Sequence, residues 1–271
     1  NDSDSLAGGD GADTVNGGSG DDYIYGNAGG DSLIGGDGND HLYGGSGAYT
    51  GDTLTGNDTL DGGAGNDTLE GGDGNDVLNA TGQAVSLSAY NISGDDLKGG
   101  AGNDTFRFSE AYGATAQYSQ EYFATGHLVA DFASGSDKLS VSKALVGNGD
   151  TTLTSATATA GTAYVSPTTT FSKAAELVIF SGDVGVEFSY GAYSGINTYV
   201  TTLQVATALG SADASFALGD ERLFVLNDGE DSAIFQFVSA NTDAVVTGAE
   251  VKLIGVVAGD ASLVASDFSL F

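Results

Sequence analysis

A nine-residue repeat fills the first part of the chain and limits the possible folds more than any other feature. It reads Gly-Gly-Asp-Gly-Ala-Asp-Thr-Val-Asn from Gly8 and Gly-Gly-Ser-Gly-Asp-Asp-Tyr-Ile-Tyr from Gly17, and further copies start at residues 26, 35, 62, 71 and 99. A unit this short cannot bury a core alone, so successive repeats must stack on one another. The sequence therefore predicts a repeat array over residues 1–107.

Each position of the repeat suits a different task. Gly at positions one, two and four permits positive φ and close approach of backbones, and Asn at position five tolerates the left-handed region. Asp at position six supplies a charged oxygen ligand for a cation. Residues seven to nine predict a short strand whose middle side chain points inward. The expected inward residues are Val15, Ile24, Leu33, Leu42, Leu60, Leu69, Leu78, Leu97 and Phe106.

The pattern resembles the RTX (repeats-in-toxin) family, whose nonapeptides wind a parallel β-roll around Ca²⁺. The resemblance implies an all-β fold, in which two nonapeptides form one coil. It also implies that each Ca²⁺ lies between loops one coil apart, held by position-six carboxylates and by backbone carbonyls of positions one to four. The implied pairs are Asp4–Asp22, Asp22–Asp40, Asp40–Asp58, Asp58–Asp76 and Asp76–Asp104 on one edge, and Asp13–Asp31 and Asp67–Asp95 on the other.

The ligand set carried over from the family would hold about seven to nine Ca²⁺ ions. It comprises Asp4, Gly8, Gly9, Asp10, Gly11, Asp13, Gly17, Gly18, Ser19, Gly20, Asp22, Gly26, Asn27, Ala28, Gly29, Asp31, Gly35, Gly36, Asp37, Gly38, Asp40, Asp52, Asp58, Gly62, Gly63, Ala64, Gly65, Asp67, Gly71, Gly72, Asp73, Gly74, Asp76, Asp95, Gly99, Gly100, Ala101, Gly102 and Asp104. Rows of Asp repel one another and each repeat buries a single apolar side chain. We therefore expect the array to need Ca²⁺ to fold.

The spacing of the repeats predicts where the pattern is irregular. Starts at 8, 26, 44 and 62 are evenly spaced by two nonapeptides, so residues 44–61 are expected to form one whole coil. Strict register puts Tyr49 in the ligand position and Gly51 in the core; a local slip of three positions uses Asp52 and Leu54 instead, and we favour the slip. The gap from 71 to 99 predicts an inserted loop over residues 80–89. A disordered Gly/Asp-rich linker, the alternative, would not keep a regular register.

The amino-acid composition limits the classes of partner that the chain can bind. The chain has 37 acidic and 7 basic residues, a net charge of −30, which argues against nucleic acid and suits hard cations. The absence of Cys excludes disulfides and thiolate metal sites. No apolar run is long enough to span a membrane. The chain has no Met, so we expect it to be part of a longer protein.

Residues 108–271 have ordinary aromatic and β-branched content, and we expect a mostly-β C-terminal domain that caps the roll. Thr198–Leu209 has the spacing of a short helix, and Asn227-Asp228-Gly229 is a hairpin signal. The expected strands are His127–Phe132, Ala163–Val165, Leu177–Phe180, Val184–Tyr190, Arg222–Leu226, Ala233–Val238 and Glu250–Val257.

Two segments resemble sequences found after the repeats in type I-secreted members of the family. The first is Asp131-Phe132 with Gly135-Ser136-Asp137-Lys138-Leu139, and the second is the chain end, Asp267-Phe268-Ser269-Leu270-Phe271. They imply a secretion signal at the chain end, a type I exporter as partner, and an extracellular location.

No G-x-S-x-G, H-E-x-x-H or phosphate-binding loop motif occurs, so we expect no enzyme activity from this chain. His41 is expected to point into solvent, and His127 to lead into a strand. Our first hypothesis is a secreted cell-surface protein of the surface-layer or adhesin type, whose partners are copies of itself or a cell-surface polysaccharide. The second is the trailing module of a secreted enzyme or toxin with its active site upstream. The third is a free-standing Ca²⁺ buffer or ligand-binding module.

Overall fold

The chain divides into two compact units in a computed structural model. The first contains Asn1–Leu87, Ser93–Ser109 and His127–Ser140, and the second contains Ser88–Ile92, Glu110–Gly126 and Val141–Phe271. The structure describes residues 2–45, 55–81, 94–109, 112–113, 115–117, 120–122, 127–146, 153, 155–159, 170–171, 174–183, 202–209, 211–212, 214–227, 230–259 and 263–271.

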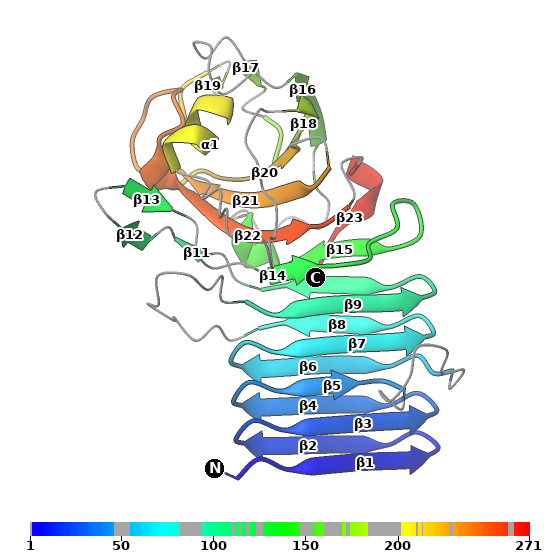
Figure 1. Cartoon of the computed structure of the whole chain (residues 1–271). Coiled ribbons are helices and arrows are strands. Elements are labelled where there is room, and N and C mark those ends of the chain that lie inside the picture. The colour runs from blue at the N-terminus through cyan, green and yellow to red at the C-terminus, as the bar shows by residue number, and fades with distance from the viewer. Residues whose placement is uncertain are drawn as a thin grey trace. The chain divides into compact units, whose positions relative to one another are not determined.

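The first unit is a roll of two parallel sheets, whose strands alternate along the chain (Figure 1). One sheet contains β1 (Ser5–Asp10), β3 (Tyr23–Ala28), β5 (His41–Tyr43), β7 (Thr68–Asp73), β9 (Asp96–Ala101) and β14 (His127–Val129). The other contains β2 (Thr14–Ser19), β4 (Ser32–Asp37), β6 (Thr59–Ala64), β8 (Val77–Ala80), β10 (Thr105–Phe108) and β15 (Lys138–Val141). This architecture confirms the all-β parallel roll that the sequence predicts.

The eighth residue of each repeat forms the core of the roll. Leu6 pairs with Ile24 and Val15 with Leu33, so each residue lies beside its counterpart one coil further along. The predicted inward residues from Ile24 onward have no exposed surface, whereas Val15, in the first coil, is partly exposed. The predicted inward positions are therefore confirmed.

The strands are longer than predicted. β2 covers positions seven to nine of one repeat and the first three positions of the next. Pairing continues through the glycines, because Gly18 pairs with Gly36 in the neighbouring coil. Positive φ occurs at positions two and four, as at Gly36 (117°) and Gly38 (144°), but not at position one, where we also expected it.

The prediction that residues 44–61 form a whole coil is wrong. Leu33 pairs with Leu60 and Leu42 with Leu69, so the register steps here by three nonapeptides instead of two. A Cβ on Gly44 would lie 2.3 Å from Asp58 Oδ2. Position one and position six are related in this way in the regular repeats, for example Gly35 and Asp40, also at 2.3 Å. Gly44 therefore begins a repeat whose position six is Asp58. The length of one nonapeptide is therefore inserted within a single repeat. Residues 46–54, and with them Tyr49, Gly51, Asp52 and Leu54, lie outside the described residues.

A second irregular step occurs after β8. Leu69 pairs with Leu97, which is further along the chain than one coil would place it, so this step also contains inserted residues. Of the predicted loop at 80–89, only Ala80 and Thr81 are described. Beyond the repeats, β14 pairs in parallel with β9, and the Lys138 N–H donates to the Asp104 carbonyl, so one coil without glycine repeats extends the roll.

The second unit contains a mixed sheet in the order β11-β22-β21-β20-β18-β16. The sheet strands are β11 (Tyr112–Gly113), β16 (Ser155–Thr159), β18 (Leu177–Asp183), β20 (Glu221–Asn227), β21 (Ser232–Val238) and β22 (Val251–Val257). Its other elements are β12 (Thr115–Gln117), β13 (Gln120–Tyr122), η1 (Lys143–Leu145), β17 (Thr170–Phe171), α1 (Thr202–Leu209), β19 (Ser211–Ala212), η2 (Gly248–Glu250), η3 (Ala265–Asp267) and β23 (Phe268–Leu270).

Most strands predicted for residues 108–271 are present with similar bounds, and the predicted short helix is α1. β20 and β21 are antiparallel, with Asn227 opposite Ser232, which confirms the hairpin signal; Asp228 and Gly229 lie outside the described residues. The predicted strands at 163–165 and 184–190 also lie outside them. In the part of the chain that the structure describes, no helix combines the length and apolar character needed to cross a membrane.

Candidate metal centres

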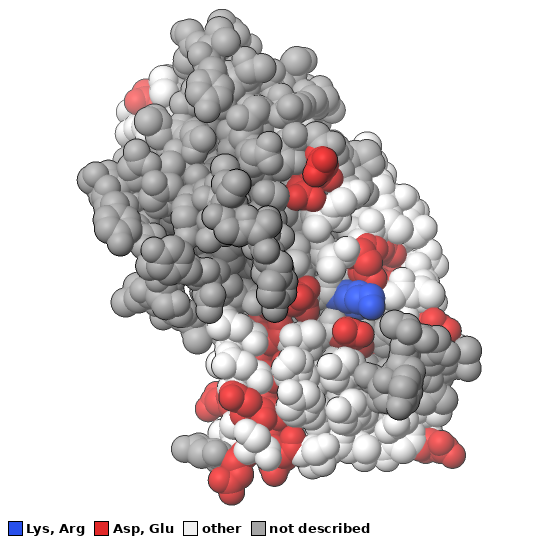
Figure 2. All heavy atoms as spheres, viewed as in Figure 1, with Lys and Arg blue, Asp and Glu red and all other residues white. Residues whose placement is uncertain are grey.

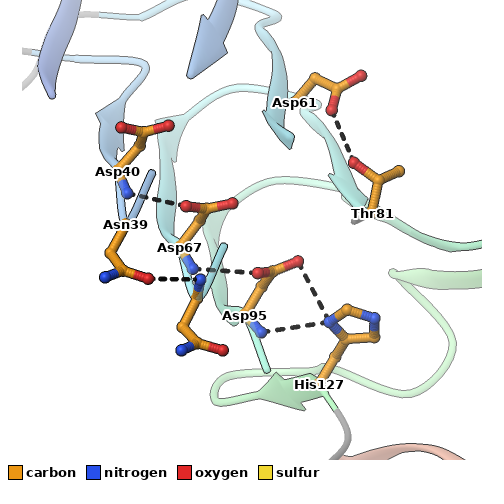
Figure 3. A network of polar contacts seen from close by, with 8 residues as sticks. Asn39, Asp40, Asp61, Asp67, Thr81, Asp95 and His127 are labelled. Carbon is orange, nitrogen blue, oxygen red and sulfur yellow. Dashed lines mark hydrogen bonds and ion pairs between the residues drawn. The ribbon is translucent and has the colours of Figure 1, made fainter. Parts of the chain in front are cut away.

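The position-six Asp residues form two rows along the edges of the roll. In each row the backbone N–H of one Asp donates to Oδ1 of the Asp one coil further along, at 2.7–3.0 Å. The first row is Asp4, Asp22, Asp40, Asp67 and Asp95, and the second row is Asp13, Asp31, Asp58, Asp76 and Asp104. Figure 3 shows Asp40, Asp67 and Asp95 in sequence.

The rows correct one predicted pair. Asp40 lies next to Asp67 rather than Asp58, and Asp58 lies between Asp31 and Asp76. The insertion within residues 44–58 causes the change, because it moves every later repeat to the opposite edge. The other predicted pairs are neighbours in the structure, three in each row.

The second carboxylate oxygen of most row members is buried and has no hydrogen-bond partner. This holds for Oδ2 of Asp13, Asp22, Asp31, Asp40, Asp67, Asp76, Asp95 and Asp104. A buried carboxylate oxygen without a hydrogen bond is costly unless a cation or proton compensates it. The buried Oδ2 atoms of the rows therefore need a cation or protons to compensate them.

Backbone carbonyls lie close to these oxygens. A Cβ on Gly26 would lie 2.4 Å from both Asp31 Oδ2 and the Gly44 carbonyl oxygen. A Cβ on Gly35 would lie 2.3 Å from Asp40 Oδ2 and 2.4 Å from the Gly62 carbonyl. The carboxylate and carbonyl oxygens are thus within about 5 Å of each other, the span of two Ca²⁺–oxygen bonds of about 2.3–2.6 Å. Only glycine leaves this space free.

Electrostatics also favour a cation. Burial raises the pKa of Asp67 to about 8, of Asp76 to about 7 and of Asp58 to about 6, with a smaller contribution from neighbouring carboxylates. Burial likewise raises the pKa of Asp40 and Asp104. A divalent cation would reverse this effect by stabilising the ionised forms.

The donor set decides which cation fits. Among the described residues, no group of three His, Cys, Asp or Glu side chains converges on one point. The oxygens that accompany the row carboxylates are backbone carbonyls, such as those of Gly44 and Gly62 beside Asp31 Oδ2 and Asp40 Oδ2. Carboxylate and carbonyl oxygens in flexible numbers suit Ca²⁺ better than the softer transition metals.

A parallel ladder at position five corrects the role predicted for its Asn residues. The N–H of Asn66 donates to Asn39 Oδ1 at 2.9 Å, and the N–H of Asn103 to Asn75 Oδ1 at 2.9 Å. Of the described non-glycine residues, only Asn27 has positive φ. Asn therefore suits position five because its Oδ1 accepts a backbone N–H from the next coil. A left-handed backbone does not explain the preference for Asn at this position. The recurrence of Asn or Asp beside the position-six Asp was the available signal.

The two histidines differ in their surroundings. His41 is partly exposed and stacks on the ring of Tyr23, with centroids 4.7 Å apart. His127 is completely buried, and its Nδ1 accepts the Asp95 N–H at 3.2 Å. The sequence did not indicate that His127 continues the first row.

The surface charge agrees with a cation-binding role. On the face shown in Figure 2, acidic side chains are spread over the described part of the chain, and basic ones are confined to a small area. Lys98 Nζ lies 3.9 Å from Glu70 Oε2 on the outer face of the β7–β9 pair.

These features define a class: a parallel β-roll whose loops carry rows of buried carboxylates for cations. The profile of the RTX calcium-binding nonapeptide repeat matches four times, at residues 1–33, 17–50, 52–84 and 91–107. Residues 1–107 therefore carry RTX calcium-binding nonapeptide repeats, and these repeats form a parallel β-roll. RTX repeats bind Ca²⁺, act as a structural module and are typical of secreted proteins.

One solved structure with detectable similarity is the solution structure of the AlgE6R3 subunit from the Azotobacter vinelandii mannuronan C5-epimerase. It shares 20% sequence identity and a TM-score of 0.31, over 96% of this chain and 79% of that one. The comparison with curated proteins gave no significant match.

Proposed function

We propose that this chain is a calcium-dependent structural module of a secreted bacterial cell-surface protein, of the surface-layer or adhesin type, which folds on binding extracellular Ca²⁺ after type I secretion. The observation that carries the proposal is the set of buried Oδ2 atoms without hydrogen bonds along both rows. The proposed ligands are the position-six carboxylates and the backbone carbonyls of positions one to four, with Asp40 paired to Asp67. Outside the cell, the proposed partners are copies of the chain or a surface polysaccharide.

The free Ca²⁺ concentration would decide on which side of the cell envelope the module folds. Extracellular Ca²⁺ modules bind with dissociation constants of about 10⁻⁴–10⁻³ M, well above the free concentration inside cells. A ligand that binds only the folded state stabilises that state by mass action. The chain would therefore stay unfolded during export and fold outside.

Calcium binding by the full chain tests the proposal with a matched pair of variants. Asp67→Asn keeps an Oδ1 acceptor for the Asp40 N–H but removes a buried negative oxygen. Asp243→Asn makes the same change of charge on an exposed side chain of the second unit and keeps the Oδ1 acceptor for the Val245 N–H. Titration calorimetry should show fewer bound ions and weaker affinity for Asp67→Asn only. Equal binding by both variants, or none by the wild type, would contradict the proposal.

The export step rests on the resemblance of the chain end. That end is well integrated in its unit: Asp267 is fully buried, and the Phe271 N–H donates to the Val141 carbonyl at 3.3 Å. An exporter would therefore have to recognise this segment before it folds. Deleting residues 267–271 is expected to abolish secretion in cells that carry the exporter, while the purified chain still binds Ca²⁺. Normal amounts of the truncated chain in the medium would place the signal elsewhere.

A further inference from the structure

His127 occupies the position in the first row that a sixth Asp would take. The Asp95 N–H donates to His127 Nδ1 at 3.2 Å, as the Asp67 N–H donates to Asp95 Oδ1 at 3.0 Å (Figure 3). The main chain keeps the same register, because the Leu128 N–H donates to the Asp95 carbonyl and the Asp96 N–H to the Asp67 carbonyl, both at 2.8 Å. His127 is therefore a member of the row by position.

Its chemistry differs from that of every other row member. An Asp in the row uses Oδ1 for the preceding N–H and leaves Oδ2 for a cation, whereas an imidazole has no second oxygen. His127 Nδ1 already accepts the Asp95 N–H and lies 3.2 Å from Asp95 Oδ2. Both side chains are completely buried. The space beside Asp95 Oδ2, where the next carboxylate would stand, is thus filled by a ring.

The second row continues differently in the same coil. The Asp104 N–H donates to Asp137 Oδ1 at 3.0 Å, so a carboxylate keeps the pattern there. Asp137 Oδ2 accepts the Ala133 N–H at 2.9 Å. The imidazole is therefore specific to the first row and is not imposed by the coil as a whole.

We propose that His127 terminates the first row of Ca²⁺ sites by placing an imidazole where the next carboxylate ligand would stand. The inference rests on the proposed function, since it concerns where the Ca²⁺ sites end. It assigns the last site of the first row to the Asp67–Asp95 pair. It also makes His127 a determinant of the number of ions bound.

Two substitutions at one position test this. His127→Asp restores a carboxylate in register with Asp95 and is expected to add a Ca²⁺ ion per chain, measured by equilibrium dialysis and elemental analysis of the full chain. His127→Asn keeps an acceptor for the Asp95 N–H without a charge, and should bind as many ions as the wild type. A purely structural role for His127 would not raise the count.

Each outcome is decisive. If His127→Asp binds the same number of ions as the wild type, the inference is wrong while the proposed function stands. If His127→Asp fails to fold in saturating Ca²⁺ although His127→Asn folds, the inference is also wrong, because a completed site would neutralise the added charge. If the wild type binds no Ca²⁺, the proposed function itself fails.

Discussion

Excess chelator is expected to unfold the repeat roll of the full chain at pH 8. Without a cation, the buried Oδ2 atoms of both rows have no hydrogen-bond partner to compensate them, and each repeat offers one apolar side chain against the cost of ordering nine residues. Hydrogen exchange read by mass spectrometry should show protection lost in peptides covering β1 to β10, and restored when Ca²⁺ is added back. Protection that persists at these strands after complete removal of Ca²⁺ would contradict the expectation.

The same experiment at lower pH is a control, because the pKa values set the direction in which the stability of the metal-free roll changes with pH. The pKa values of Asp58, Asp67 and Asp76 are raised to about 6, 8 and 7, so the folded, metal-free roll binds protons more tightly than the unfolded chain. The resulting stabilisation is fully present below the ordinary Asp pKa of 3.8 and is lost as pH rises through about 6–8. The chelated chain should therefore retain more protection at pH 5 than at pH 8. Ca²⁺ affinity should change in the opposite direction, because protons compete with the ion.

The regular part of the roll could be predicted because its signals are local and repeated. The apolar eighth residue, the glycine pair and the position-six Asp recur in most nonapeptides, so counting along the sequence predicts the core and most row neighbours. The irregular coil could not be predicted this way. An insertion as long as a repeat cannot be distinguished by counting from a degenerate copy between Gly44 and Asp58. The paired strands show the difference, since Leu42 lies beside Leu69.

The remaining gaps in prediction have a similar cause. The place of His127 in the first row depends on β14 pairing with β9 after the segment 109–126, in which no repeat sets the register. In the second unit, individual strands such as β20 and β21 were predictable from composition and a turn signal. The parallel pairing of β18 with β20 joins distant segments and leaves no local pattern in the sequence.

Substitution of Gly36 by Ala is expected to be among the most damaging single changes in the roll. Gly36 has a φ of 117°, and a Cβ there would lie 2.1 Å from the Gly18 carbonyl oxygen in the neighbouring coil. The backbone cannot yield locally, because Gly18 and Gly36 are paired within the β2–β4 ladder. The two coils would have to separate, which would also move the adjacent row oxygens away from their ion.

Gly18→Ala is the matched control for this prediction. Gly18 occupies the same position of its repeat with a φ of 105°, but a Cβ there would meet nothing within 4 Å. Gly18→Ala should therefore lose only the left-handed backbone contribution of about 1–2 kcal/mol. Gly36→Ala should lose more than about 4 kcal/mol, the range reached only by exceptional substitutions. Chemical denaturation of both variants in saturating Ca²⁺ measures the difference; equal losses would mean that backbone strain, and not the close stacking of coils, explains the glycine at position two.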